Sequence, residues 1–188
     1  NGEITINVAS TFTANTTAGE DNEFAAGLYS TGYLLEAAPF GGGTTASVGT
    51  EISNTISPSC FLDAGFRDTP TPYTATGSPP NVTLLQATDS AIFDCNATTV
   101  DITFTDTANY TAPTGGGASN LTAQHKFQYQ LNESGSFTDY PVGLSISNSN
   151  TDANGDMKVE VRSTWTPDAD KLFASEYTAE TTVTVTAK

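Results

Sequence analysis

The sequence predicts an all-β protein, and more narrowly an immunoglobulin-like β-sandwich. Apolar and polar residues alternate with a period of two in several segments, which is the pattern of strands buried on one face. Gly, Pro, Asn and Asp recur at short intervals, and no apolar stripe keeps helical spacing over three turns. About eight to ten short strands without helices indicate a sandwich or barrel, and the two cysteines and strand-like chain ends favour the immunoglobulin-like arrangement.

The first expected strand, Glu3 to Thr13, carries its apolar side chains on one face: Ile4, Ile6, Val8 and Phe12. Residues 23–37 are apolar and ambiguous, and they predict one or two strands or a short helix. The glycine triplet Gly41 to Gly43 ends this segment because glycine fits poorly inside either element. A weaker strand is expected from Glu51 to Ile56.

The middle of the chain begins with a proline-rich stretch, 67–81, which predicts a long surface loop because proline cannot donate a ladder hydrogen bond. Strands follow at 82–88, 91–95 and 98–107. Residues 121–132 predict another strand, whose shared face holds Leu121, Ala123, His125, Phe127, Tyr129 and Leu131.

The last third predicts a hairpin and a terminal strand. Val142 to Ser149 and Met157 to Trp165 flank a turn containing Asn154-Gly155, a pair that accepts positive φ. The chain then crosses over to Ser175–Lys188, an alternating strand at whose end the sequence stops. Because an unpaired strand edge is a template for another chain, the partners of this strand matter for function.

The composition fits one exported domain. The chain has 188 residues, of which 37% are hydrophobic, and a net charge of −15. That charge argues against nucleic-acid binding and attraction to anionic membranes. The chain begins at Asn1 and contains no apolar run near the roughly 18 residues of a membrane span, so we expect a mature extracellular protein without membrane insertion.

Cys60 and Cys95 are the only cysteines. In an exported chain they predict a disulfide worth roughly 4 kcal/mol in the loop-entropy description. Two buried free thiols are the alternative.

Candidate chemistry is sparse. His125 is the only histidine, so a histidine-dependent triad or metal site would require it, and no G-x-S-x-G elbow accompanies it. Asp152 to Asp156 offers oxygen ligands, but the glycine is early and no bidentate Glu follows, so a solvated turn is the preferred interpretation over a Ca²⁺ loop. No carboxylate pair stands out. We therefore expect no enzymatic activity, no metal and no cofactor.

Six N-x-S/T sequons are mildly more than chance gives, and they would mark exposed sites in a glycosylated protein. They begin at Asn15, Asn81, Asn96, Asn109, Asn120 and Asn132.

The ending LFASEYTAETTVTVTAK resembles the end of chaperone–usher fimbrial subunits, through an aromatic residue, YT and a TVTVT-like strand. GEITINVASTF at the N-terminus adds to the likeness, which extends to archaeal surface filaments that work similarly. The resemblance implies an incomplete sandwich, 14–188, completed by the 1–13 strand of the next subunit. It makes Ile4, Ile6, Val8 and Phe12 the donor residues, and Tyr177, Val183 and Val185 the edge of the acceptor groove.

Two hypotheses follow, besides a weaker third one of an enzyme with unassigned carboxylates. The first is a structural subunit of an extracellular pilus, a homopolymer serving adhesion or biofilm formation, with host or cell-surface glycans as possible partners. The second is a secreted carbohydrate-binding or adhesin module, in which exposed aromatic rings stack on sugars: Tyr73, Tyr110, Tyr140 and Trp165. Within the first, the N-terminal strand either inserts into a neighbour or pairs within its own sandwich.

Overall fold

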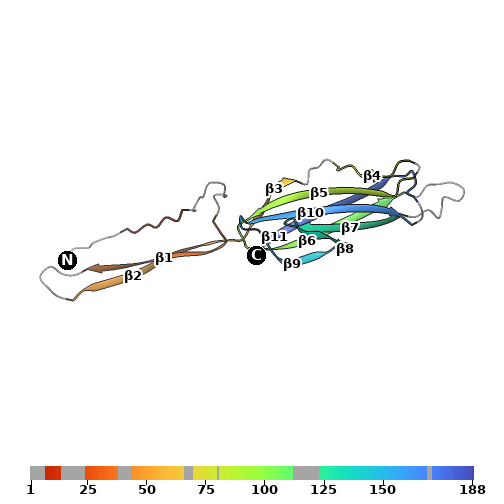
Figure 1. Ribbon diagram of the computed structural model, residues 1–188. Coiled ribbons are helices and arrows are strands. Elements are labelled where there is room, and N and C mark those ends of the chain that lie inside the picture. Colours follow the sequence, from red (N-terminus) through yellow and green to blue (C-terminus); the bar gives the residue numbers. More distant parts are fainter. Residues whose placement is uncertain are drawn as a thin grey trace. The chain divides into compact units, whose positions relative to one another are not determined.

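The protein is all-β, as the sequence predicts. In the computed structural model, the strands all pair antiparallel and no helix occurs in the described part of the chain (Figure 1). The structure describes residues 7–13, 24–37, 44–65, 70–79, 81–111, 123–168 and 171–188.

The chain divides into two compact units, residues 1–58 and 59–188. The sequence places the boundary after residue 13 instead. The reason for the difference is that, among the residues the structure describes, β1 (Gly27–Ala37) and β2 (Ala46–Ile56) form a two-stranded sheet of their own.

The first unit is built on this β1–β2 hairpin. All eleven residues of each strand are in register, from Gly27 opposite Ile56 to Ala37 opposite Ala46. The ambiguous segment 23–37 is therefore mainly a strand. On one face of β1 the side chains are half-buried, at Tyr29, Thr31, Tyr33 and Leu35.

Residues 7–13 belong to no strand in the structure, so the strand expected from Glu3 to Thr13 is wrong for this part. They contact β1 instead: the Phe12 ring lies edge-on to Tyr29 at 5.6 Å between centroids, and the Tyr33 hydroxyl donates to the Ala9 carbonyl at 3.3 Å. Alternation alone does not make a strand, because the backbone also needs a paired neighbour.

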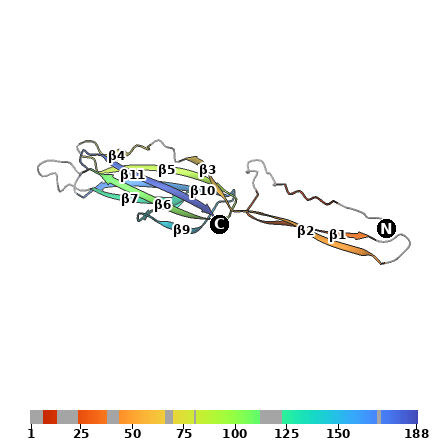
Figure 2. The same cartoon turned by 180° about the vertical axis from the view of Figure 1, so that it is seen from behind.

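The second unit is a β-sandwich. One sheet has the order β3-β5-β10-β7-β8, with β4 also pairing with β5, and the other has the order β11-β6-β9. Figure 1 shows the first layer, and Figure 2 shows β11 and β6 from behind. The strands are β3 (Cys60–Gly65), β4 (Thr74–Thr76), β5 (Leu84–Cys95), β6 (Thr99–Tyr110), β7 (Ala123–Leu131), β8 (Ser134–Tyr140), β9 (Ser145–Asn150), β10 (Asp156–Pro167) and β11 (Tyr177–Ala187).

The core of the sandwich comes from alternate residues of its central strands. On β6, Ile102 and Phe104 are 0% exposed, and on β10 the same holds for Met157 and Val159. The strands expected at 82–88 and 91–95 form one continuous β5, and the strand expected at 98–107 is β6.

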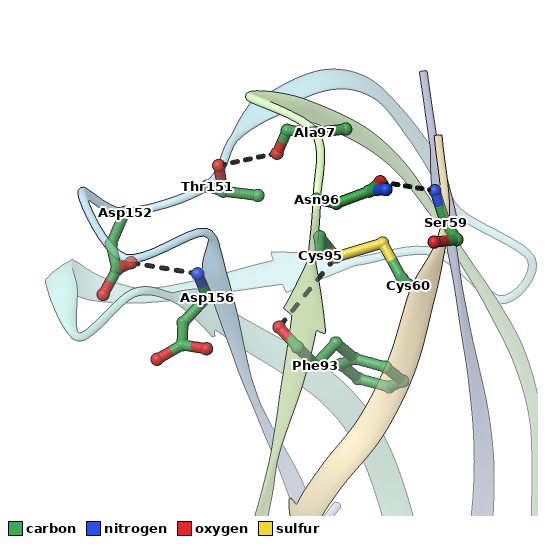
Figure 3. The surroundings of a disulfide bond; sticks show 9 residues. All are labelled: Ser59, Cys60, Phe93, Cys95, Asn96, Ala97, Thr151, Asp152 and Asp156. Atoms are coloured by element: carbon green, nitrogen blue, oxygen red, sulfur yellow. Dashed lines mark hydrogen bonds between the residues drawn. A yellow bond between two sulfur atoms is a disulfide. The ribbon is translucent and has the colours of Figure 1, made fainter. Parts of the chain in front are cut away.

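Cys60 and Cys95 form a disulfide, as expected (Figure 3). The two residues are directly opposite each other on β3 and β5, so the bond joins neighbours within one sheet. Beside it, the Ser59 backbone N–H donates to Oδ1 of Asn96 at 2.8 Å. The disulfide therefore attaches the start of β3 to the end of β5.

The expected hairpin of 142–149 with 157–165 is wrong. β9 pairs with β6, whereas β10 pairs with β5 and β7, so the connection crosses from one sheet to the other. Asp152 shapes this connection, since its Oδ1 accepts the backbone N–H groups of Asn154 and Asp156 at 2.8 and 3.0 Å. Gly155 has φ 95°, so the positive φ expected there is present.

The β7–β8 hairpin was not predicted from the sequence. Its turn residues Asn132 and Glu133 have φ of 48° and 53°, although the pair lacks glycine. Two side-chain contacts hold the turn: the Lys158 backbone N–H donates to Oδ1 of Asn132 at 2.8 Å, and the Lys158 ammonium pairs with Glu133. Contacts from β10 thus stabilise a turn that local sequence does not predict.

Candidate functional site: a groove beside the C-terminal strand

β11 lies at the edge of its sheet. All eleven of its residues pair with β6, from Tyr177 opposite Tyr110 to Ala187 opposite Val100, and it pairs with no other strand in the described residues. Tyr177, Val183 and Val185 are on its half-buried face, as the alternation predicts. Within the described residues, the other edge of β11 thus carries no backbone pairing, the condition under which a strand can act as a template for another chain.

A groove with a volume of about 680 Å³ lies next to this edge. Both sheets contribute to its walls, together with the segment that precedes β4. The groove therefore leads from the surface toward the apolar interior. Its lining includes Thr71, Tyr73, Ala87, Asp89, Phe127, Val161, Ser163, Ala179 and Thr181.

A polar row interrupts the apolar inner face of β6 and β11. Asp106 is 5% exposed and lies opposite Thr181 in the β6–β11 register. Its Oδ1 accepts the Tyr140 hydroxyl at 2.9 Å, while its Oδ2 has no hydrogen-bond partner among the described residues. Burial, and then the adjacent Asp106, raise the pKa of the Tyr140 phenol, so this hydroxyl keeps its proton.

His125, which is half-buried, belongs to a second polar cluster. Its Nε2 lies 2.7 Å from the Ser163 hydroxyl, which in turn lies 2.6 Å from the Tyr73 hydroxyl. The Trp165 indole N–H donates to Tyr73 at 3.1 Å. Burial lowers the pKa of His125 to about 4, so the ring is neutral at pH 7. The cluster attaches the segment before β4 to the wall of the groove.

A smaller apolar pocket of about 440 Å³ lies at the start of β11. Val82, Leu85, Leu172, Phe173 and Tyr177 contribute to it. The Leu172 backbone N–H donates to the Val82 carbonyl at 2.7 Å, which fixes the segment leading into β11. Leu172 and Phe173, part of the sequence resemblance, thus position the start of the edge strand.

Two of the four expected donor residues, Val8 and Phe12, lie in the part of the chain that the structure describes. Ile4 and Ile6 lie outside the described residues. Val8 is half-buried and Phe12 is 42% exposed, in the segment that contacts β1. The donor role of all four residues stays a prediction.

Several other candidates can be placed. The Asp152 carboxylate accepts a hydrogen bond from a backbone N–H of its own turn, and the described residues contain no group of three or more His, Cys, Asp or Glu suited to a metal.

Among the described sequons, Asn81 and Asn109 are exposed, whereas Asn96 and Asn132 are half-buried and accept backbone hydrogen bonds through their side chains. Asn15 and Asn120 lie outside the described residues.

The aromatic residues proposed as sugar-stacking platforms are mostly internal. Trp165 is 3% exposed and Tyr140 is 7% exposed, while Tyr73 and Tyr110 are half-buried. Trp165 packs on Tyr177 and His125, with ring centroids 5.4 and 4.6 Å apart. The prediction of exposed platforms is therefore wrong, because these rings lie on the inward phase of their strands or cover the end of the core.

Asp106 and Ser163 were not predicted from the sequence as site residues, and Tyr73 was predicted only as a sugar-stacking ring. A signal existed for Asp106, since it continues the inward phase of Ile102 and Phe104 on β6. The Tyr73–Ser163–His125 cluster joins three segments distant in sequence and had no comparable local signal.

Comparisons with known proteins give little further guidance. No protein-family profile and no curated protein sequence matches the chain. A chain of a solved structure described as a chaperone-tip adhesin complex of CFA/I fimbriae biogenesis is similar at 9% identity and a TM-score of 0.38. The match covers 87% of this chain and 54% of that one, so this chain spans about half the length of its structural neighbour. No helix in the described residues is long and apolar enough to cross a membrane.

Proposed function

We propose that this chain is a structural subunit of an extracellular filament that serves adhesion or biofilm formation. Residues 1–13 of one copy insert beside β11 of the next. The observation that carries the proposal is the combination of an edge strand paired on one side, β11, with an open groove next to it. An extended segment from another chain would extend the sheet and place alternate side chains in that groove.

The energetics favour such an insertion. A donor strand completes the backbone ladder of β11, which otherwise presents N–H and C=O groups to water. Each fully buried apolar side chain contributes about 1.5–3 kcal/mol. The inward-facing residues of the donor strand include Val8 and Phe12, which the structure leaves half-buried and exposed.

The chemistry of the chain is compatible with this role. A disulfide favours a compartment outside the reducing cytoplasm. A net charge of −15 supports solubility of the free subunit. The role requires neither a catalytic group nor a cofactor, and glycans as adhesion partners are a further prediction from the sequence.

Deletion of residues 1–13 tests the proposal. We expect the full chain to form filaments in negative-stain electron microscopy, and the shortened chain to remain soluble without forming them. Val8→Asp should also abolish assembly, because it puts a charge on the inward phase. Ala9→Asp is the matched control on the outward phase and should still assemble. Filaments from the deleted chain would disprove donor insertion.

A further inference from the structure

We infer the register of this insertion: the donor strand runs antiparallel to β11, with Phe12 opposite Ala179, Ser10 opposite Thr181 and Val8 opposite Val183. The inference rests on the proposed filament function and adds the contacts that select one alignment. In this register Ser10, the polar residue of the donor strand's inward phase, is a specificity determinant of assembly.

The acceptor side has a distinctive order of inward-facing pairs. Along β6 and β11 they are Tyr110–Tyr177, Ala108–Ala179, Asp106–Thr181, Phe104–Val183, Ile102–Val185 and Val100–Ala187. After the aromatic pair, one small pair and one polar pair are thus followed by three apolar pairs. An added strand would continue each of these rows, because directly opposed residues lie on the same face of a sheet.

The donor sequence has the matching order. Its inward phase is Ile4, Ile6, Val8, Ser10 and Phe12, in which Ser10 is the one polar residue. In the proposed register Ser10 continues the polar row and the three aliphatic residues continue the apolar rows. In this register residues 4–13 lie opposite Thr178 to Ala187, so ten of the eleven residues of β11 are paired.

Other registers break this match. A shift by two residues in either direction puts Ser10 opposite Ala179 or Val183, and puts Val8 or Phe12 in the polar row. Parallel alignments that keep the inward phase and nearly full overlap place Ser10 opposite Val183 or Val185. A one-residue shift turns all the apolar side chains outward.

The space in the groove agrees with the position of Phe12. The groove of about 680 Å³ reaches Ala179 and Thr181 on β11 and Ala87 and Ser163 on the facing sheet. These side chains are small, so the groove is open where the register puts the largest donor side chain. Farther along β11, Val183 and Val185 already pack against the core.

The polar row supplies a reason for a hydroxyl in the donor strand. Asp106 is buried, and its Oδ2 has no partner among the described residues. Thr181 lies between Asp106 and the added strand. The Thr181 side chain hydrogen-bonds Tyr140, and a donor Ser10 hydroxyl beside Thr181 would add a further polar partner to this row, which a valine would not.

Disulfide trapping tests the register. Full-length Ser10→Cys and Thr181→Cys chains are mixed, allowed to assemble and oxidised, and covalent dimers are measured on a non-reducing gel. We expect efficient dimer formation, since opposed residues are within disulfide reach. Ser10→Cys mixed with Val183→Cys is the control shifted by two residues, and should give at least about fivefold less dimer at the longer diagonal distance. Each variant alone controls for symmetric disulfides.

The outcomes separate the two proposals. Filaments in which the Val183→Cys mixture cross-links better, or in which neither mixture does, overturn the register but keep the filament. Filaments that persist without residues 1–13 overturn donor insertion itself. If the cysteine variants fail to assemble, Ser10→Val and Ser10→Thr decide instead: we expect Ser10→Val to raise the critical concentration about tenfold, in line with one lost buried hydrogen bond. The critical concentration of Ser10→Thr should stay near that of the parent. Equal critical concentrations for the two variants would overturn the register.

Discussion

The two units contain strands of similar length but very different burial. β1 and β2 pair over eleven residues each, yet no described residue of residues 1–58 is buried. The sandwich strands β6 and β10 have twelve residues each and enclose a core with several residues at 0% exposure. A two-stranded hairpin is at best marginally stable alone in water. Alternation and register therefore specify strands, while stability comes from a second layer.

The largest expected effect comes from removing a large side chain in the sandwich core. Phe104 is 0% exposed, and its ring centroid lies 4.8 Å from that of Tyr140 and 5.6 Å from that of Tyr129. Phe104→Ala should lower the free energy of unfolding by about 3–5 kcal/mol. Denaturant titration followed by fluorescence of the single tryptophan, Trp165, reports this unit. A loss below about 1 kcal/mol would contradict the layered core.

The disulfide should give the next largest effect. The Cys60→Ala/Cys95→Ala double variant loses a cross-link over a separation of 35 residues. We expect a loss of roughly 2–4 kcal/mol in the same titration. Reduction of the parent protein is the matched control and should give a similar loss. An unchanged midpoint would mean that β3 is attached to β5 by its backbone pairing alone.

Local patterns predicted the faces of the sandwich strands but not their partners. The inward phase of β11 and the strand character of β6 follow from alternation, a local property. The partners of β9 and β10 depend on packing between distant segments, which is why the expected hairpin of these strands is wrong. The turn at Asn132-Glu133 depends on contacts from Lys158 and was missed for the same reason.

The candidate site was predictable to a similar degree. The edge residues Tyr177, Val183 and Val185 came from the alternation and the resemblance, and their half-buried phase is present in the structure. The groove depends on small residues from both sheets meeting across the interior, including Ala87 and Ala179. A period of two says where a side chain points, but not how large the side chains opposite it are.

The pH dependence of stability should give an effect of intermediate size, and it concerns the sandwich, which contains His125. Burial lowers the pKa of His125 to about 4 from an ordinary value of 6.5. As the pH falls, His125 therefore binds a proton at a higher pH in the unfolded chain than in the folded one. The sandwich should lose stability as the pH falls from about 6.5 to about 4, by about 1–2 kcal/mol after screening of a half-exposed ring.

Urea titrations at several pH values, again followed by Trp165 fluorescence, measure this slope. His125→Gln should be less stable at pH 7 and show a flatter profile between pH 6.5 and 4.5, because glutamine does not titrate. If the stability of the variant fell with pH as steeply as that of the parent, carboxylates and not His125 would account for the slope. Asp101, Glu133 and Asp139 have pKa values lowered mainly by side-chain hydrogen bonds to Lys188, Lys158 and Lys126, so they contribute below this window.

The smallest effect is expected in the hairpin. Leu34 is 66% exposed on β1 and Leu28 is 67% exposed, so truncation to alanine removes little buried surface. Leu34→Ala should leave the Trp165 transition within about 0.5 kcal/mol of the parent, in contrast to Phe104→Ala. If Leu34→Ala instead shifted the midpoint by more than about 1 kcal/mol, this face of β1 would have to be covered in solution. Repeating the titration over a hundredfold range of protein concentration then decides whether a second copy covers it, because only intermolecular burial makes the midpoint depend on concentration.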